Sequence, residues 1–176
     1  DSQPDTRWKS ILGTTRNEKA IHDLQAAETQ YKLDAANQIK IEGPSSLAVA
    51  RLQADNSPLD IVNSLLAQAN LTVQLEVVGA ELRAKQADSV YSYARMSDGE
   101  RSALVFAAEV VAAPPGMVFL IDEPELHLHR SIVVALVKAL ILARPDCGFV
   151  VCTHQLELPV AVKGSEIVLV RGSAWP

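Results

Sequence analysis

Five consecutive apolar residues followed by two carboxylates constrain this chain more than any other stretch of its sequence. The run Met117–Ile121 is too short for a buried helix, and its branched and aromatic side chains are typical of a buried parallel strand. Asp122 and Glu123 follow directly, and Pro124 then ends any pairing of the strand. Because ligands of open α/β sheets bind at the carboxyl ends of strands, we expect a site for a metal ion and a nucleotide here.

The two carboxylates have two interpretations. In the first, Asp122 holds Mg²⁺ through water and Glu123 polarises an attacking water molecule. In the second, the pair only caps the next helix, because side-chain oxygens at a helix start accept hydrogen bonds from backbone N–H groups. The choice depends on which other polar residues reach the same edge of the sheet.

Composition bounds the class of protein. The chain has 176 residues, 48% hydrophobic and 21% charged, with a net charge of −5, which suits one globular domain with a sizeable core. The mild acidity does not indicate DNA binding, although a local basic patch stays open. Cys147 and Cys152 lie too far apart on an extended segment to form a disulfide, which favours a reduced, cytoplasmic setting. No membrane span or signal peptide is visible. Because the chain opens on Asp1 without a methionine, we expect it to be a piece of something longer.

The N-terminal part predicts an arm. Residues 15–40 contain neither Gly nor Pro, and a thin apolar stripe predicts an exposed helix or an arm packed on one side. A coiled coil is a second interpretation, but the pattern spans too few heptads to support it. After the break at Gly43-Pro44, Ser45 or Ser46 can cap a short helix that ends at Leu52.

Residues 57–94 predict a helix followed by a small antiparallel ribbon. Ser57 as N-cap and Pro58 as first helical residue start a helix to Asn70. Apolar and polar residues alternate over 71–77, which predicts a half-buried strand, and a turn at Gly79-Ala80 leads to a return strand over 81–87.

From residue 97 onwards helices and strands alternate. Helices are predicted over 97–113 and 130–143, and strands over 117–121, 147–152 and 166–170. This order is typical of the α/β class, in which helices cover a parallel sheet.

Three polar clusters fall at the ends of these elements. Ser97-Asp98-Gly99-Glu100 starts a helix, and its free backbone N–H groups and positive dipole end suit a phosphate. Asp122-Glu123 and Thr153-His154 each follow a strand, and His154 has a donor for a phosphate oxygen. Taken singly, the first cluster is more often a simple cap and a lone His more often structural. Their order and spacing together predict phosphoryl-transfer chemistry.

The same residues resemble the motifs of ABC-type ATPases, a branch of the AAA family. The run Met96–Leu104 (MSDGERSAL) is similar to the signature motif, Val118–His129 (VFLIDEPELHLH) to Walker B and the D-loop, and Val150–His154 (VVCTH) to the His switch. The motif Glu-Pro-Glu-x-His-Leu-His most resembles that of RecF-like, SMC-like and OLD-family ATPases, many of which act in DNA repair or phage defence.

The resemblance implies a homodimer that sandwiches ATP between two copies. The signature residues Ser97-Asp98-Gly99-Glu100 would bind the nucleotide of the partner copy, with Ser97 and Gly99 on its γ-phosphate. Asp122 would support Mg²⁺, Glu123 would act as the catalytic base, and His154 would touch the γ-phosphate. The D-loop would cross the interface, and its residues Glu125, His127 and His129 are expected to contact the nucleotide bound there.

One departure from the family pattern is large. No Gly-x-x-x-x-Gly-Lys-Ser/Thr occurs in the sequence, so the phosphate-cradling P-loop is missing. We therefore expect residues 57–176 to be the C-terminal lobe of an ABC-type ATPase, and residues 1–56 to be a helical arm or insertion with loops. The N-terminal lobe with the P-loop is expected upstream of Asp1, and without it the chain should bind ATP poorly.

Two other functions remain open. The chain can be a non-catalytic dimerisation or regulatory module that keeps the fold and binds a nuclease or other effector, which the absent P-loop favours and the presence of Glu123 and His154 disfavours. A zinc site is suggested by His127 and His129 with Glu123 or Glu125, but no second cluster of ligands supports it.

Overall fold

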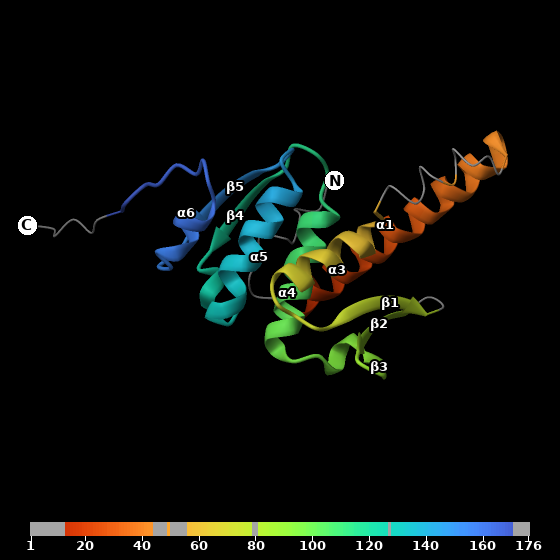
Figure 1. The fold of residues 1–176 in the computed structure, drawn as a ribbon, viewed down its shortest axis with the longest axis horizontal. Coiled ribbons are helices and arrows are strands. Elements are labelled where there is room, and N and C mark those ends of the chain that lie inside the picture. Colours follow the sequence, from red (N-terminus) through yellow and green to blue (C-terminus); the bar gives the residue numbers. More distant parts are fainter. Residues whose placement is uncertain (1–12, 44–48, 50–55, 79–80, 127, 171–176) are drawn as a thin grey trace, which may run out of the picture.

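The computed structural model describes residues 13–43, 49, 56–78, 81–126 and 128–170. In chain order the elements are α1 (Gly13–Glu42), α3 (Pro58–Gln68), β1 (Gln74–Val78), β2 (Glu81–Gln86), β3 (Ser89–Ser92), η2 (Tyr93–Arg95), α4 (Asp98–Val111), β4 (Val118–Asp122), η3 (Pro124–Leu126), α5 (Arg130–Ala143), β5 (Gly148–Cys152) and α6 (Glu157–Ala161) (Figure 1). The predicted α/β class is confirmed, because helices accompany a parallel pair of strands, β4 and β5.

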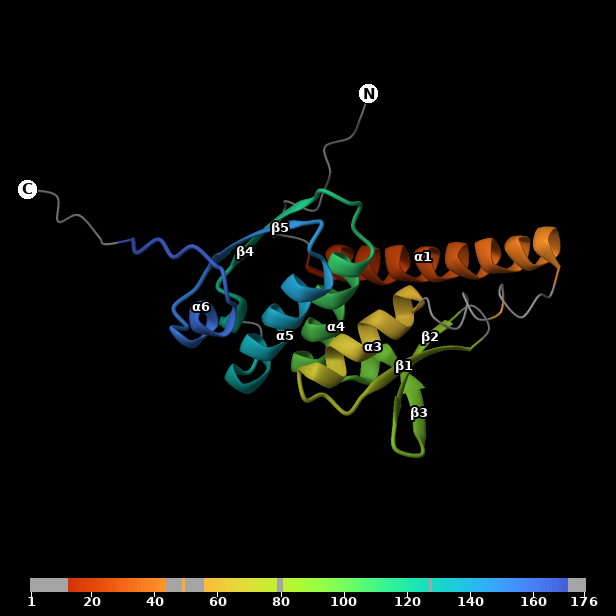
Figure 2. The same ribbon diagram turned by 45° about the horizontal axis from the view of Figure 1, so that its top comes forward.

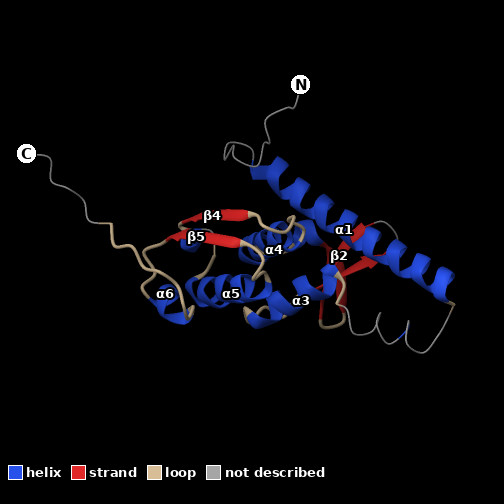
Figure 3. Cartoon of the chain, turned by 90° about the horizontal axis from the view of Figure 1, so that it is seen from above, coloured by secondary structure: helices blue, strands red, loops and turns tan. Residues whose placement is uncertain are grey.

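Strands β4 and β5 pair in register from Val118 opposite Gly148 to Asp122 opposite Cys152. Helices α4 and α5 lie on one side of the pair (Figure 3). On that side the rings of Phe119 and Phe149 stack with centroids 5.3 Å apart and pack against the helical core. The carboxyl ends of the two strands therefore lie side by side, as the sequence predicted.

The expectation that β4 is buried on both faces is wrong. Its residues alternate between half-buried and exposed, and Val118, Leu120 and Val150 are 53%, 62% and 51% exposed. The reason is that helices cover one face only, and nothing within the described residues covers the other. Within the described residues, the apolar pattern of these strands therefore marks a pair that helices cover on one face only.

The predicted strand over 166–170 is also not formed. These residues have no regular structure and run away from the sheet towards the C-terminus (Figure 1). The apolar side chains from Ile167 to Val170 are exposed. A strand needs a neighbour for its backbone N–H and C=O groups, and no described segment pairs with this one.

The core lies between α1, α3, α4 and α5, and buried residues of β1 and β2 (Leu75, Leu82 and Ala84) also belong to it. The predicted start of α3 is confirmed: the Ser57 hydroxyl accepts a hydrogen bond from Asp60 N–H at 3.1 Å, and the Asp60 carboxylate accepts one from Ser57 N–H at 3.2 Å. Such a reciprocal cap stabilises a helix start by about 1 kcal/mol. The buried apolar face of this helix consists of Leu59, Val62, Leu65, Leu66 and Ala69.

Helix α1 is the predicted arm packed on one side. Ile21 and Leu24 are buried against α3 and α4, whereas the second half of the helix extends beyond the other helices (Figure 1, Figure 2). Glu28 is buried at the junction, where its carboxylate accepts a hydrogen bond from Leu59 N–H at 3.1 Å and lies 3.2 Å from the Lys32 ammonium. The arm therefore contacts the first turn of α3 through a charged side chain.

The ribbon has three antiparallel strands in the order β1-β2-β3. The first two were predicted, but β3 was not, since its four residues show too little alternation. Asn63 of α3 satisfies the edge of β1: its side-chain amide donates to Leu75 O at 2.9 Å and accepts from Leu75 N–H at 2.7 Å. The predicted turn at 79–80 lies outside the described residues, as does the short helix over 45–52 apart from the helical Val49.

Candidate functional site

The carboxyl ends of β4 and β5 continue to interact beyond their last paired residues. Glu123 N–H donates to the carbonyl of Cys152 at 2.8 Å, one position past the pairing of Asp122 with Cys152. Two residues further along, His154 places Nε2 3.1 Å from Oε1 of Glu123. The structure therefore brings together the two polar clusters that the sequence placed after these strands.

Glu123 has an unusual backbone. Its φ is +44°, in the left-handed region that residues other than glycine rarely adopt. Pro124 follows and starts the short helix η3, whose Leu126 N–H donates to Glu123 O at 2.9 Å. A left-handed conformation costs about 1–2 kcal/mol for such a residue. Backbone strain of this kind gathers at functional sites, which favours the functional interpretation of Glu123 over the capping one.

Glu125 connects the two strand ends. Its two carboxylate oxygens each lie 2.9 Å from the Thr153 hydroxyl, and Oε1 also accepts a hydrogen bond from His154 N–H at 2.7 Å. Burial disfavours the charged form, but hydrogen bonds from the Glu125 and His154 backbones and from Thr153, together with the charge of His154, lower the pKa of this carboxyl. Glu125 is therefore an ionised, hydrogen-bonded carboxylate at neutral pH.

Asp122 is exposed at the end of β4. Its carboxylate has no hydrogen-bond or ion-pair partner among the residues that the structure describes. Magnesium prefers oxygen ligands and is commonly held by one or two carboxylates together with phosphates and water. The free oxygens of Asp122 fit that ion, whereas the described residues contain no group of three His, Cys, Asp or Glu side chains that could hold a metal on their own.

The start of α4 forms a capping box. The Ser97 hydroxyl accepts from Glu100 N–H at 3.3 Å, and the Glu100 carboxylate accepts from Ser97 N–H at 3.0 Å and from the Ser97 hydroxyl at 2.7 Å. Asp98 pairs with Arg101. At Gly99 an added Cβ would meet no heavy atom within 4 Å. The fold itself therefore does not require glycine there, which leaves space for close approach from outside.

The structure does not bring this helix start to the strand ends. In Figures 1 and 2 the first turn of α4 lies beside the ribbon, whereas the ends of β4 and β5 lie beside α6. Within the described residues, no hydrogen bond or ion pair joins Ser97-Asp98-Gly99-Glu100 to Asp122, Glu123 or His154. Two of the three clusters thus meet within one chain, and the third lies apart from them.

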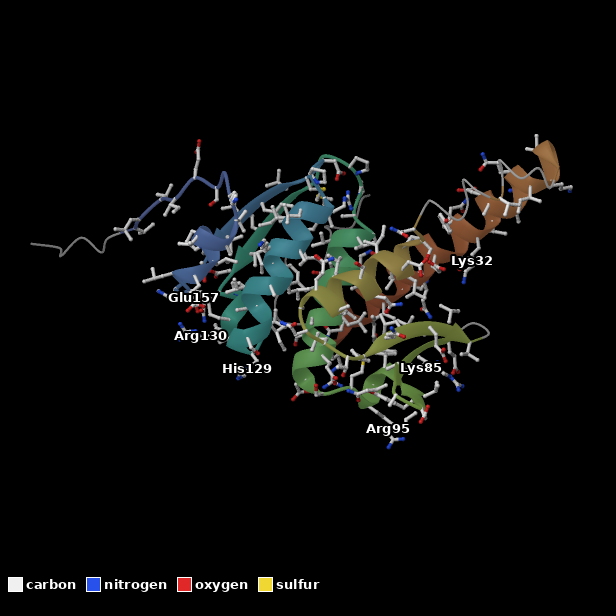
Figure 4. The ribbon with its side chains drawn as sticks, in the orientation of Figure 1. Lys32, Lys85, Arg95, His129, Arg130 and Glu157 are labelled. Carbon is white, nitrogen blue, oxygen red and sulfur yellow. The ribbon has the colours of Figure 1, made fainter. Side chains whose placement is uncertain are left out.

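The residues that were predicted to form the D-loop do not all lie at the strand ends. His129 is the N-cap of α5, where Nδ1 accepts a hydrogen bond from Ser131 N–H at 3.3 Å. Figure 4 shows His129 at the start of this helix, near the exposed ion pair in which Arg130 and Glu157 lie 3.1 Å apart. His127 lies outside the described residues.

Sequence reasoning missed the part that Thr153 plays. Its hydroxyl binds Glu125 and also accepts a hydrogen bond from Gln155 N–H at 2.9 Å. A hydroxyl residue directly after an apolar strand was a visible signal, but its partner lies 28 residues earlier in the chain. Pairing across that distance depends on the register of β4 and β5, which no local pattern supplies.

Comparison with known proteins identifies the family. Residues 7–161 match the family described as AAA domain, putative AbiEii toxin, Type IV TA system. The chain belongs to this AAA-domain family. The match confirms the membership of the AAA family that the motifs indicated. A comparison of this AAA-domain chain with curated proteins finds no match.

Solved structures similar to the AAA-domain chain include heads of SMC proteins. One is an Smc head bound to the C-winged helix domain of ScpA, with 18% identity over 60% of this chain and 36% of that chain, and a TM-score of 0.48. A second comes from work on ATP-driven dimerization and DNA-stimulated activation of SMC ATPases, with 19% identity, coverage of 65% and 77%, and a TM-score of 0.46. A third is an Smc head domain with an extended coiled coil, bound to the C-terminal domain of ScpA derived from Pyrococcus furiosus, with 17% identity, coverage of 84% and 48%, and a TM-score of 0.46. The chain thus spans about a third and about half of the first and third of these.

No helix in the part of the AAA-domain chain that the structure describes is long and apolar enough to cross a membrane. Both cysteines, Cys147 and Cys152, are free thiols.

Proposed function

We propose that this AAA-domain chain is the hydrolytic lobe of an ABC-type ATPase that acts as a dimer with ATP at the interface. The observation that carries the proposal is the contact between Glu123 and His154 at 3.1 Å, beside an exposed Asp122 that has no partner within the described residues. The φ of +44° at Glu123 supports this role, because strained backbone conformations gather at functional sites.

The chemistry follows from these positions. Glu123 is the general base that takes a proton from the attacking water, because its carboxylate is held at the open end of the strands. His154 orients that carboxylate and donates to the transferred phosphoryl group. Asp122 would hold Mg²⁺, which neutralises phosphate charge when bound.

The signature motif acts on the partner copy. The start of α4 lies beside the ribbon and apart from the strand ends, so Ser97 and Gly99 serve a nucleotide bound elsewhere than at their own Glu123. The open space at Gly99 and the N–H groups of the first turn suit a γ-phosphate approaching in trans. Asp98 and Glu100 hold that turn through Arg101 and Ser97.

The P-loop comes from an N-terminal lobe outside this sequence. The uncovered apolar face of β4 and β5 supports that assignment, because an apolar parallel pair calls for cover on its second side. With that lobe in place, residues 57–176 form the C-terminal lobe and residues 1–56 the arm. The free thiols of Cys147 and Cys152 favour a cytoplasmic setting.

The process that the ATPase serves is phage defence or DNA repair, with a nuclease or other effector as partner. The family description names a putative toxin of a toxin–antitoxin system, which favours the defence role. DNA is a weaker candidate partner because the chain carries a net charge of −5.

A non-catalytic module is the second candidate. The absence of a P-loop from the sequence favours it, because the chain on its own then lacks the phosphate cradle. In that case the same fold would serve as a dimerisation or regulatory platform for an effector, and Glu123 would be dispensable.

Replacing Glu123 by Gln distinguishes the two functions. In the full-length protein that carries this chain and its P-loop, we expect Glu123→Gln to lower kcat for ATP hydrolysis by about 100-fold or more while ATP still binds, because a general base typically contributes that much. The measurement is steady-state phosphate release, with nucleotide binding followed separately.

The matched control is Glu157→Gln, which changes an exposed carboxylate that pairs with Arg130 away from Glu123. The control should hydrolyse ATP at the parental rate. If Glu123→Gln does so too, the assignment of the base is wrong and the non-catalytic module is favoured.

A further inference from the structure

Glu125 was predicted to contact the nucleotide or the dimer interface as part of the D-loop, but its hydrogen bonds are made inside the chain. Both carboxylate oxygens face the Thr153 hydroxyl at 2.9 Å, and Oε1 also accepts from His154 N–H at 2.7 Å. A contact with a nucleotide would have to compete with these charge-assisted bonds, which are among the strongest in proteins.

One carboxylate therefore fixes three successive residues of the β5 end. Glu125 binds the hydroxyl of Thr153 and the backbone of His154, and the same hydroxyl accepts a hydrogen bond from Gln155 N–H at 2.9 Å. We call Glu125, the Thr153 hydroxyl and the His154 N–H the strand-end clamp. It joins the turn after β4 to the turn after β5.

The imidazole of His154 depends on this clamp more than on packing. Its side chain is 86% exposed, so neighbouring side chains do not hold the ring in place. Its contacts are the 3.1 Å approach to Glu123 and the backbone bond to Glu125. On the other side of the pair, Glu123 is held by Cys152 O and by the η3 turn that contains Glu125.

We propose that Glu125 is a positioning residue that holds His154 against Glu123 by fixing the backbone of residues 153–155. This inference rests on the proposed function only for what His154 and Glu123 do, and the geometry of the clamp stands without it. The carboxylate stays charged at neutral pH because hydrogen bonds lower its pKa. Displacing His154 should lower the rate of ATP hydrolysis, because displacements of about 1 Å in catalytic geometry can reduce rates by about 100-fold.

The clamp is tested first on this chain without nucleotide, by ¹⁵N-resolved NMR of His154. Glu125→Ala should shift the His154 amide signal upfield, and should move the ring nitrogen signals towards those of Glu123→Gln, in which the contact with Glu123 is weakened. Glu125→Gln should give an intermediate ring shift, because an amide oxygen can still accept from His154 N–H but its NH₂ group cannot accept from the Thr153 hydroxyl.

Thr153→Val is a second variant that removes only the hydroxyl, and Thr153→Ser is its matched control. If Glu125→Ala fails to fold, Thr153→Val should still move the His154 ring signals whereas Thr153→Ser should not. Ring signals unchanged in Glu125→Ala, or in Thr153→Val where that is the readable variant, would overturn the proposal.

The second measurement is ATP hydrolysis by the full-length protein. Glu125→Ala should lower kcat by about tenfold or more and change KM for ATP by less than about threefold, since positioning acts on the transition state and not on ground-state binding. A raised KM with unchanged kcat would overturn the proposal and restore a nucleotide contact. Glu157→Ala, outside the clamp, should match the parent in both parameters.

Failure of the clamp proposal and failure of the proposed catalytic base give different results. If Glu125→Ala moves the His154 ring while Glu123→Gln leaves turnover unchanged, the clamp is supported and the proposed catalytic base is wrong. If Glu123→Gln abolishes turnover while Glu125→Ala leaves both the ring and kcat unchanged, the base is supported and the clamp is wrong.

Discussion

At the residue scale, Arg144 shows how one side chain joins two helices. Its guanidinium donates from Nη1 to the carbonyls of Val110 at 2.6 Å and Val111 at 3.2 Å, at the C-terminal end of α4. From Nε and Nη2 it forms a two-bond ion pair with Asp146, at 2.9 and 2.8 Å. Free carbonyls at a helix C-terminus favour a positive charge, so Arg144 caps α4 from the end of α5.

The pair of Asp146 and Arg144 predicts a pH dependence of stability. The hydrogen bond from Arg144 lowers the pKa of Asp146 from its ordinary value of 3.8 to about 2. Because the carboxyl ionises more readily in the folded state, its stabilising effect is present above the ordinary pKa and is lost as the pH falls towards 2. We expect Asp146→Asn to lower the free energy of unfolding at pH 7 and to match the parent near pH 2.

Urea unfolding of this chain between pH 2 and 7 measures the effect. The control is Asp88→Asn, at an exposed aspartate that has no hydrogen-bond or ion-pair partner in the described part of the chain. The control should differ little from the parent at pH 7. An Asp146→Asn variant as stable as the parent at pH 7 would show that the ion pair contributes nothing.

At the element scale, the arm α1 is held by its first half. Leu24 is fully buried against the lobe, and Glu28 reaches the first turn of α3, whereas Leu33 lies on the exposed side of the helix. The packed half of α1 therefore stabilises the start of α3 and the flank of α4 together.

Replacing two leucines of α1 one at a time distinguishes the effect of packing from the effect of helix propensity. Leu24→Ala should lower the free energy of unfolding by about 2–4 kcal/mol, because a buried leucine loses both its transfer free energy and its close packing. Leu33→Ala is the matched control and should change it by less than about 0.5 kcal/mol, since Ala is also a good helix former. Chemical denaturation of the two variants checks this. Equal losses would mean that the arm does not pack on the lobe.

Elements whose signals are local were predictable, and those that depend on a distant partner were not. Residues close in sequence determine the caps at Ser57 and Ser97 and the alternation of β1, so these features could be predicted from the sequence. Segment 166–170 has the apolar pattern of a strand but no described neighbour to pair with. At the site, the positions after β4 and β5 were predicted. The bond between Glu125 and Thr153, which are 28 residues apart, could not be predicted because it depends on the register of the two strands.

At the scale of the whole molecule, the described residues form one buried core and a pair of strands, β4 and β5, that is covered on one face only. The four-helix core is flanked on one side by the ribbon and on the other by β4 and β5 (Figure 3). The outer face of that pair presents Val118, Leu120 and Val150 to solvent. Contiguous exposed apolar residues mark surfaces that another protein segment covers, which is the position proposed for the N-terminal lobe.

Leu120 tests whether this face is covered in the full-length protein. In this chain, Leu120→Asp should change the free energy of unfolding by less than about 0.5 kcal/mol, because the side chain is already largely exposed. In the full-length protein the same change should cost about 3 kcal/mol or more, since a charge would then be buried without a partner.

Thermal and urea unfolding of both proteins give the comparison. Val137→Asp is a positive control, because Val137 is fully buried in the helical core and its replacement should destabilise both proteins strongly. If Leu120→Asp is equally harmless in both, the sheet face is not where the missing lobe packs.

At the position of Glu123, the residue that the left-handed backbone favours differs from the residue that the proposed chemistry requires. For folding alone, Gly or Asn would be preferred there, because both adopt a φ near +44° at lower cost. Selection that acted only on folding would let this position drift to one of them within the lineage. If Glu123 is the catalytic base, as proposed, a glutamate is therefore expected here in proteins that hydrolyse ATP, and Gly or Asn in proteins that keep only the fold.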